Sequence, residues 1–458
     1  MISTMRLAAT GLPVEDEIDH IRRALADHGR AVLQAEPGAG KTTVVPLRLL
    51  DEQWLRGRRI VMLEPRRVAA RAAARRMAGL LGEEPGDTVG WITRDDRRIG
   101  PRTRIEVVTE GVLTSQLVDD PGLDGVGLVI FDEFHERSLP GDVGFALTLH
   151  SRRHHGLDAR LLVMSATIDD RQLARALGDG ESPAPAISSP GRTFPVEVLW
   201  RPRKKRDRLE AVVARAVREA LAGAGDVLVF LPGVAEIRRT ARLLRGELGS
   251  GVAEVTELHG SLPSDEQDRA LRASPHGRRV VLATDLAETS LTVQGVGAVV
   301  DSGLAREPRF DPRTAMTRLT TVPASRASGE QRAGRAGREG PGVAIRLWSK
   351  VHHGTRRPFR SPSILEVDLA GVVLELARRG ITDPAEVPFL DPPPADTWNA
   401  AVGLLTTLGA LDTAGRATRI GTAMASVPTH PRLARMVVSP RHPWLGCLVA
   451  AALDERDL

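Results

Sequence analysis

The chain contains no tyrosine, a single cysteine and few aromatic residues of any kind. Only 3% of its 458 residues are aromatic, and Cys447 is the one cysteine. One cysteine excludes an internal disulfide and cannot build a zinc site by itself, which favours a reducing compartment. So few rings argue against an oligonucleotide site that holds its ligand mainly by stacking bases on aromatic side chains.

The chain also lacks a long hydrophobic run and a strong excess of one charge. No stretch approaches the roughly 18 apolar residues of a membrane span, and residues 1–17 hold no signal-peptide core. Lys and Arg outnumber Asp and Glu by 63 to 58, and the pI is about 10.1. We therefore expect a cytoplasmic protein without a membrane partner. The charge balance is compatible with a polyanion partner but does not demonstrate one.

Short runs rich in Val, Ile and Leu alternate with longer stretches of helical period in two successive blocks. This alternation predicts an α/β fold, with two parallel sheets flanked by helices. Residues 181–186 and 189–191, rich in Pro and Gly, are interpreted as the linker between the blocks. The predicted strands are Ala31–Ala35, Ile60–Leu63, Ile105–Val108, Leu128–Phe131 and Leu161–Met164, then Val227–Leu231, Val280–Ala283, Ala298–Val300 and Val343–Leu347.

Beyond Pro358 the sequence changes to helical stretches with Pro-rich joints, which predicts a small helical domain. Ala400–Leu411 has the pattern of an amphipathic helix, and Ile420–Pro428 is interpreted as a short strand or wing. Leu448–Leu458 resembles an unfinished helix without a stop signal, so we expect a truncated chain. The basic stretch Arg201–Arg208 is either a solvated loop or a nucleic-acid contact.

A glycine-rich segment follows the first predicted strand and precedes a helical stretch, which is the context of a phosphate-binding P-loop. Lys41 would reach the β and γ phosphates, and the Thr42 hydroxyl would bind Mg²⁺. Ala35 stands where the first glycine is usual, and a small residue still permits the turn. A chance Gly-rich turn is the alternative. The predicted nucleotide contacts here are Glu36, Pro37, Gly38, Ala39, Gly40, Lys41, Thr42 and Thr43.

Two neighbouring acids follow the strand Leu128–Phe131, at the edge of a parallel sheet where ligands bind. Asp132 would hold Mg²⁺ through water, and Glu133 would orient or deprotonate the attacking water. The predicted metal site is thus Thr42, Asp132 and Glu133, and an acidic surface turn is the alternative. His135 is expected to bond Gln331 or residues 165–167, or else to pack.

Gln331, Arg335 and Arg338 are spaced by four and three residues, so one helix would present all three on one face. A guanidinium at the γ-phosphate stabilises the charge of the transition state. Arg332 is out of phase and is interpreted as structural. Alone, this segment could be a solvated arginine-rich face. Together with the P-loop and the two acids, it predicts a motor that closes on ATP.

The combined motifs resemble those of superfamily 2 helicases of the DEAH/DExH group, and residues 132–139 are similar to the bacterial HrpB-type ATP-dependent helicases. The likeness extends over residues 12–440. Further motifs that carry it are Glu64-Pro65-Arg66-Arg67, Thr109-Glu110-Gly111, Ser165-Ala166-Thr167, Phe230-Leu231-Pro232-Gly233, Leu258-His259-Gly260 and residues 283–292.

The resemblance implies a domain order, a reaction and a substrate. It implies RecA-like domains at 1–190 and 191–357, a winged-helix domain at 358–428 and the start of a truncated helical bundle at 429–458. It also implies an ATP-dependent, Mg²⁺-requiring helicase or translocase that moves 3′ to 5′ along single-stranded RNA, with DNA as the alternative. A monomer is favoured.

The resemblance also assigns roles to further residues. Ser165 and Thr167 would couple the nucleotide state to strand binding, and residues 306–323 would form a hairpin that separates strands. Hydroxyls, amides and arginines can bind a phosphate backbone without reading sequence. Arg66 and Arg67 could instead cap a strand. The residues implied to contact the strand are Arg66, Arg67, Thr109, Glu110, Gly111, Thr284 and Thr289.

Three departures from the family pattern have consequences. Asp285 stands where the family has Asn, which is expected to weaken a polar contact. Adenine would lie against Arg76, but the aromatic position opposite it falls on Leu271, so we expect loose base recognition and hydrolysis of several NTPs besides ATP. The domains that follow in relatives are missing, so grip and processivity are expected to be impaired.

Two other classes of protein fit part of the pattern. A nucleotide-gated clamp or RNP-remodelling switch would hydrolyse ATP without unwinding, and displacement of a tailed duplex would distinguish it from a helicase. A small-molecule kinase is disfavoured, because it needs no second segment bearing Gln331, Arg335 and Arg338.

Overall fold

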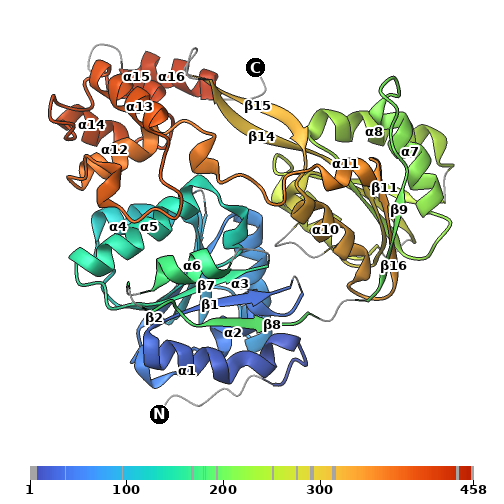
Figure 1. Cartoon of the computed structure of the whole chain (residues 1–458), viewed down its shortest axis with the longest axis horizontal. Helices are drawn as coiled ribbons and strands as arrows, with labels where there is room; N and C mark the ends of the chain where they lie inside the picture. Colours follow the sequence, from blue (N-terminus) through green and yellow to red (C-terminus); the bar gives the residue numbers. More distant parts are fainter. Residues whose placement is uncertain are drawn as a thin grey trace.

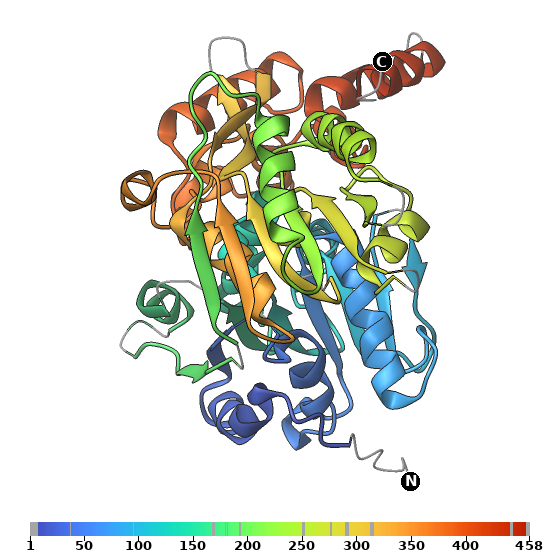
Figure 2. The same cartoon turned by 90° about the vertical axis from the view of Figure 1, so that its right-hand side faces the viewer.

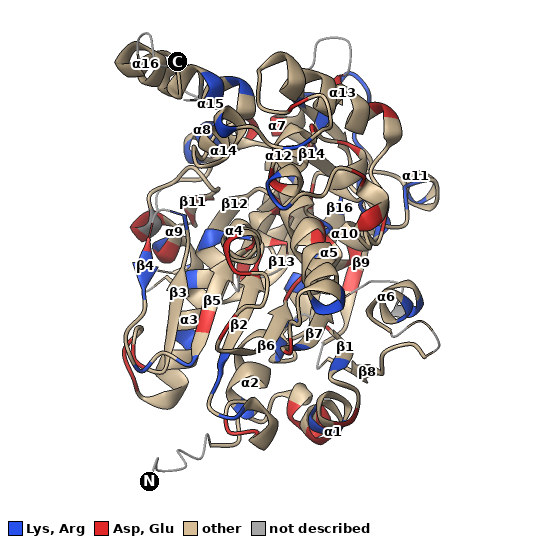
Figure 3. Cartoon of the chain, turned by 90° about the vertical axis from the view of Figure 1, so that its left-hand side faces the viewer, with Lys and Arg blue, Asp and Glu red and all other residues tan. Residues whose placement is uncertain are grey.

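The protein consists of two α/β lobes and a group of C-terminal helices (Figure 1). A computed structural model describes residues 8–36, 38–94, 96–166, 170–178, 180, 182–191, 194–249, 252–274, 277–288, 293–311, 316–439 and 443–454. Within these ranges, no helix combines the length and the apolar character that crossing a bilayer requires. Basic and acidic segments are interspersed over the face shown in Figure 3, in keeping with the small net charge.

Lobe 1 is built on a sheet of eight strands among the described residues, in the order β4-β3-β5-β2-β6-β7-β1-β8. All neighbours pair in parallel except β3 and β4. The predicted strands are confirmed. The strands are β1 (Arg30–Ala35), β2 (Arg59–Glu64), β3 (Val89–Ile92), β4 (Arg97–Arg98), β5 (Ile105–Thr109), β6 (Val126–Phe131), β7 (Arg160–Ser165) and β8 (Ala186–Ser189).

One part of the expected linker is instead a strand. β8 pairs in parallel with β1 from Val32↔Ala186 to Ala35↔Ser189. The linker interpretation of residues 181–186 and 189–191 is therefore wrong where it overlaps this strand. The edge strand escapes prediction because it is short and mostly exposed, so it carries no apolar run.

Lobe 2 contains a second sheet of six strands within the described ranges, in the order β11-β12-β10-β13-β16-β9. Every neighbouring pair is parallel, which confirms the second predicted block. The antiparallel hairpin β14–β15 projects from this lobe where residues 306–323 predicted one (Figure 1). The strands are β9 (Val196–Trp200), β10 (Asp226–Phe230), β11 (Glu254–Leu258), β12 (Arg279–Ala283), β13 (Val296–Asp301), β14 (Leu304–Asp311), β15 (Met316–Pro323) and β16 (Gly342–Arg346).

Helices cover both faces of each sheet, as expected for parallel strands that are buried on both sides. On β2, Ile60 and Met62 join one apolar cluster while Val61 and Leu63 join another, following the period of two. The helices of lobe 1 are α1 (Ile18–His28), α2 (Lys41–Arg48), α3 (Arg67–Leu81), α4 (Glu110–Asp119), α5 (Leu139–His154) and α6 (Asp170–Leu177). Those of lobe 2 are α7 (Leu209–Ala220), α8 (Val234–Glu247), α9 (Ser264–Leu271), α10 (Arg326–Gly334) and α11 (Lys350–Gly354).

The C-terminal helices share an apolar core with lobe 1. Leu374, Trp398 and Leu405 belong to the same buried cluster as Phe145 and Leu149 of α5. These helices and the hairpin lie at the same end of the molecule (Figure 2). The helices are α12 (Ala370–Arg378), α13 (Ala395–Thr407), α14 (Arg419–Ala425), α15 (Pro431–Val437) and α16 (Pro443–Asp454).

The strand or wing expected at Ile420–Pro428 is wrong, because most of this segment is helix α14. Thr418 begins that helix by accepting a hydrogen bond from the Gly421 amide at 3.0 Å, as an N-cap residue does. An isolated bridge joins Leu411 and Ala417 just before it. The domain limits at 190, 357 and 428 stay predictions.

Candidate nucleotide site between the lobes

The P-loop joins β1 to α2 and turns through two glycines in the left-handed region. Gly38 has φ 92° and Gly40 has φ 96°, values that L side chains rarely adopt. A Cβ on Gly40 would also lie 3.0 Å from Leu12. Glu36 and Gly38 are exposed, whereas Ala39 is buried; Pro37 lies outside the described residues. The loop therefore leads directly into the N-terminus of α2, and a helix N-terminus is a favourable place for an anion.

Residues distant in sequence meet at one edge of the lobe 1 sheet. Lys41 at the start of α2 lies with its Nζ 2.8 Å from Oε1 of Glu133, and both side chains are almost fully buried. The Thr42 hydroxyl donates to the Asp132 carboxylate. β1 and β6 are separated only by β7, so their carboxyl ends reach the same edge. The structure thus brings together the two halves of the predicted phosphate and metal site.

The two adjacent carboxyls differ in their proton affinity. Burial raises the pKa of Asp132, and the neighbouring Glu133 raises it further although Lys41 opposes this. For Glu133, burial is outweighed by the charge of Lys41 and the hydrogen bond from it, so the pKa of Glu133 falls below the ordinary value. Glu133 is therefore ionised at neutral pH, as a residue that accepts a proton or orients water must be.

Glu64 is a third carboxyl at this edge, and its sequence pattern predicted no role for it. It ends β2, next to β6 in the sheet, and is fully buried. Burial, Asp132 and Glu133 raise its pKa well above the ordinary range. A neutral Glu64 adds no negative charge beside Asp132 and Glu133. Its position at the end of a predicted strand was the signal that could have identified it.

The residues present fit a magnesium-bound triphosphate. The Thr42 hydroxyl and the Asp132 carboxylate are hard oxygen donors in direct contact, and Mg²⁺ is usually held by one or two such groups plus phosphate oxygens. Lys41 is paired with Glu133, and its flexible ammonium is also the group that would bind phosphates.

Lobe 2 contacts this site through His135. Its Nε2 lies 3.0 Å from the Gln331 amide nitrogen, and its Nδ1 accepts from the Ala166 amide at 3.4 Å. Both expected contacts of His135 therefore occur. A neutral ring that accepts at Nδ1 carries its proton at Nε2, so the side-chain amide of Gln331 has to present its oxygen there to accept that proton. Burial lowers the pKa of His135, which keeps the ring neutral. Ser165 is fully buried at the end of β7, and Thr167 lies outside the described residues.

The expected single helix carrying Gln331, Arg335 and Arg338 is wrong. Helix α10 ends at Gly334, and Arg335–Gly337 continue as a tighter 3-10 turn. The glycines at both ends of this turn disfavour a regular helix. Arg335 is buried and Arg338 is half-buried. Desolvation lowers the pKa of Arg338 to about 10 although the charge of Glu133 opposes this, and the pKa of Arg335 shifts in the same direction.

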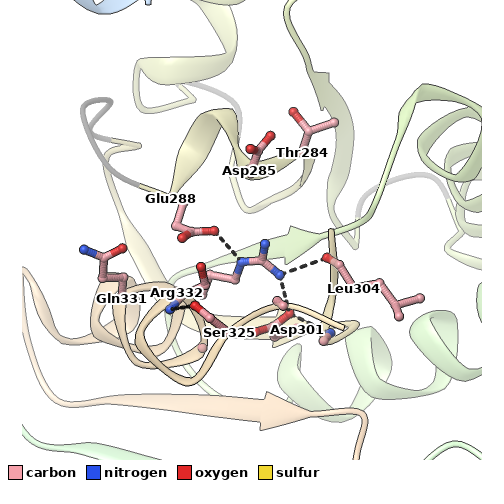
Figure 4. A network of polar contacts seen from close by, with 12 residues as sticks. Thr284, Asp285, Glu288, Asp301, Leu304, Ser325, Gln331 and Arg332 are labelled. Atoms are coloured by element: carbon pink, nitrogen blue, oxygen red, sulfur yellow. Dashed lines mark hydrogen bonds and ion pairs between the residues drawn. The ribbon is translucent and has the colours of Figure 1, made fainter. Parts of the chain in front are cut away.

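Arg332 has a structural role, as predicted from its helical position, which is out of phase with Gln331 and Arg335. Its Nε lies 2.8 Å from Glu288, and its Nη1 lies 3.0 Å from Asp301 and 3.1 Å from the Leu304 carbonyl oxygen (Figure 4). The side chain is only 1% accessible. Arg332 therefore ties α10 to the edge of the lobe 2 sheet.

The residues predicted to contact the nucleic-acid strand lie at or just after the carboxyl ends of the parallel β-strands β2, β5 and β12. Arg66 and Arg67 stand where α3 begins, and Thr284 caps a 3-10 turn by accepting from the Leu286 amide at 3.4 Å. Thr109 and Gly111 line a groove of about 890 Å³ between lobe 1 and the C-terminal helices. Thr289 lies outside the described residues.

The shifted pKa of Glu110 predicts that the free energy of unfolding depends on pH. Burial, with Glu136 and Asp142 nearby, raises its pKa to about 7, although the Ser138 hydroxyl at 2.6 Å and Arg66 act in the opposite direction. The folded protein then holds this proton more tightly than the unfolded chain, so the stabilising contribution is present below about pH 4.5 and is lost as the pH rises through about 7.

We expect Glu110→Gln to flatten the fall in unfolding free energy between about pH 5 and pH 8, measured by urea denaturation. Parallel pH profiles for the variant and the wild type would contradict this assignment.

The predicted base-binding residues lie where α3 faces lobe 2. Arg76 is exposed on α3, and Leu271 is the last residue of α9. Ala69 of α3 joins an apolar cluster of lobe 2 to which Leu271 also packs, and Arg75 lies 2.7 Å from Asp268. The two lobes therefore meet along α3, next to the place assigned to the base.

Comparison with known proteins agrees with this arrangement. Residues 17–176 match the DEAD/DEAH box helicase family, and residues 207–340 match the helicase conserved C-terminal domain. ATP-dependent RNA helicase HrpB of Escherichia coli K12 is 45% identical over 451 residues, covering 97% of this chain and 55% of that protein. ATP-dependent RNA helicase HrpA of the same strain is 37% identical over 466 residues, covering 97% and 35%.

Solved structures give the same result. A crystal structure of E. coli DEAH/RHA helicase HrpB has a TM-score of 0.90 at 44% identity, covering 97% of this chain and 57% of that one. A structure of E. coli DExH-box NTPase HrpB has a TM-score of 0.86 and covers 98% and 55%. The chain thus spans about half the length of the HrpB relatives it matches. With two RecA-like lobes and both family matches, the chain belongs to the DEAD/DEAH box helicases, in the DEAH/DExH group.

Proposed function

We propose that this chain is an ATP-dependent helicase or translocase that acts on single-stranded RNA. The observation that carries the proposal is that Lys41 and Glu133 form a buried pair in lobe 1, and that His135 beside them lies 3.0 Å from Gln331, on the helix of lobe 2 that leads to Arg335. A triphosphate held between these groups would pull the lobes together, and its cleavage would release them. The names of the HrpB and HrpA relatives, which describe ATP-dependent RNA helicases, support RNA as the substrate.

The geometry supports the following proposed roles at the nucleotide. Mg²⁺ would be held by Thr42 and Asp132 and would neutralise charge on the phosphates. Glu133 would orient the attacking water and accept its proton, while Arg335 and Arg338 would stabilise charge that develops on the γ-phosphate. ATP is the proposed nucleotide, and other NTPs are accepted if base contacts are limited to Arg76.

Glu133→Gln provides the test of this chemistry. The amide cannot accept the proton, so we expect ATP hydrolysis to fall by about 10²- to 10⁴-fold while nucleotide binding is retained. Binding of a fluorescent ATP analogue and release of phosphate should be measured on the same preparation. Glu106→Gln is a matched control, because that buried glutamate lies on β5, which β2 separates from β6, and pairs with Arg59 at 2.7 Å. Unchanged hydrolysis in Glu133→Gln would overturn the proposal.

Strand binding is proposed to use backbone charge rather than base stacking. Arg66 and Arg67 supply guanidiniums, and Thr109, Gly111 and Thr284 supply hydroxyls and amides at the same edge of the two sheets. If about six phosphates are bound, the log of affinity should fall with the log of salt concentration with a slope near −4. A flat dependence would contradict this interface.

Matched RNA and DNA oligonucleotides should then be compared for stimulation of ATP hydrolysis. Stimulation by RNA with displacement of a tailed duplex supports a helicase, whereas stimulation without displacement supports the clamp. We further propose action in the cytoplasm as a monomer. The winged-helix interpretation is retained as a proposal for α12 to α14.

A further inference from the structure

Four charged residues from three parts of the chain form one cluster, here called the Asp285 cluster: Arg66, Glu136, Asp285 and Arg360. Arg66 of lobe 1 lies 3.3 Å from Glu136 and 3.4 Å from the Asp285 carboxylate of lobe 2. Arg360, in the segment that joins lobe 2 to the C-terminal helices, lies 3.1 Å from the same oxygen of Asp285. One carboxylate thus joins lobe 1, lobe 2 and the connecting segment.

The Asp285 carboxylate is charged and can be reached from solvent. Its side chain is 30% accessible, and those of Arg66 and Arg360 are 17% and 27% accessible. Burial opposes ionisation, but Arg66 and Arg360 lower the pKa of Asp285 to about 2. At neutral pH an anion therefore stands between two guanidiniums that could bind another anion in its place.

The cluster lies between two cavities. A cavity of about 230 Å³ contains Gln331 and His135 of the nucleotide site. A second, of about 220 Å³, contains Arg306 at the base of the hairpin β14–β15. Glu136 and Arg360 line both cavities, so the cluster marks the place where the nucleotide side of the inter-lobe region meets the hairpin side.

We propose that the Asp285 carboxylate takes the place of a strand phosphate in the nucleic-acid-free protein, and that an incoming phosphate must displace it from Arg66 and Arg360. This inference rests on the proposed function, because it requires a strand that reaches Arg66. Carboxylate and phosphate are alternative partners for a guanidinium, since both accept its parallel N–H donors. Asp285 is accordingly a positioning residue.

Displacement of the Asp285 carboxylate by a strand phosphate would couple nucleic-acid binding to movement of the lobes. Arg66 and Asp285 belong to different lobes, so a phosphate that binds Arg66 in place of Asp285 removes one ion pair between the lobes. Asparagine at this position would keep the size and an acceptor oxygen of Asp285 but would lose the charge that competes with phosphate. The Asp285 carboxylate therefore lowers the affinity for a nucleic-acid strand, whereas an asparagine at this position would not.

The test is a binding titration without nucleotide at fixed salt, using a fluorescent oligouridylate of about 12 nucleotides. We expect Asp285→Asn to bind about fivefold more tightly than the wild type, the effect of one partly exposed ion pair. Asp285→Glu keeps the charge and should bind no more tightly than the wild type. Asp268→Asn is the matched control, because Asp268 pairs with Arg75 across the same two lobes and lines neither cavity.

The outcomes are distinguishable. A misfolded variant can lose affinity but cannot gain it, so tighter binding by Asp285→Asn alone supports the proposal. Equal or weaker binding by Asp285→Asn, or an equal gain in Asp285→Glu or Asp268→Asn, would overturn it. Failure of the wild type to bind any strand would overturn the proposed function and this inference together. Binding by the wild type without a gain in Asp285→Asn would overturn the inference alone.

Discussion

Arg335→Lys is expected to lower kcat for ATP hydrolysis by about 10³-fold, the effect of removing a guanidinium from the γ-phosphate. Arg335 is buried, its Nε donates to the Glu288 carbonyl at 3.0 Å, and Glu133 lies near enough to affect its pKa. A lysine keeps the charge but cannot present the planar fork to phosphate. The interaction is made chiefly in the transition state, so KM for ATP should change little.

Arg326→Lys provides the control for this variant. Arg326 begins the same helix α10 but is exposed, so its replacement should leave both kcat and KM unchanged. Steady-state phosphate release with saturating RNA gives both constants, and thermal unfolding shows whether the variants are folded. A kcat for Arg335→Lys close to that of the wild type, in a folded protein, would remove the arginine from the catalytic role proposed for it.

Arg332→Leu is expected to destabilise the protein by about 3 to 5 kcal/mol, because it leaves two buried carboxylates without their partner. Glu288 and Asp301 flank the guanidinium at 2.8 and 3.0 Å, and both are themselves buried (Figure 4). Two arginines three positions apart thus have different expected phenotypes: loss of Arg335 lowers the rate, and loss of Arg332 lowers stability.

The stability effect can be separated from a simple packing change. Adding Glu288→Gln to Arg332→Leu removes one of the uncompensated charges, so the double variant should recover part of the loss. Urea denaturation followed by circular dichroism measures the effect. A single variant within about 0.5 kcal/mol of the wild type would show that the network is not needed for stability.

Much of the fold could be predicted because parallel strands buried on both faces leave a clear apolar run. Ile60–Leu63 and Val280–Ala283 are such runs, and both are strands in the structure. The positions of the P-loop and of the two acids after β6 could also be predicted, because their chemistry requires particular residue types at the end of a strand. The structure adds the distances that bring Lys41 to Glu133.

The wrong predictions, and the features that were not predicted, have physical causes. β8 is short and exposed, so nothing in its sequence separates it from a linker. The pattern of Ile420–Pro428 could not show that a capping threonine starts a helix just before it. Glu64 and the ion pairs of Asp285 depend on partners far away in sequence, which a single chain without tertiary contacts does not reveal.

The core shared by lobe 1 and the C-terminal helices determines which parts can shift together. Because α5 and α12 bury their side chains in one cluster, these helices should travel with lobe 1 as a single rigid body. The hairpin β14–β15 belongs to lobe 2 and is tied to the connecting segment by the Phe310 amide, which donates to the Glu366 carbonyl at 2.7 Å. If ATP hydrolysis opens the nucleotide cleft, the hairpin would move with lobe 2 relative to the C-terminal helices. A change at the phosphates would then also change the spacing at the end of the molecule where the hairpin and these helices lie.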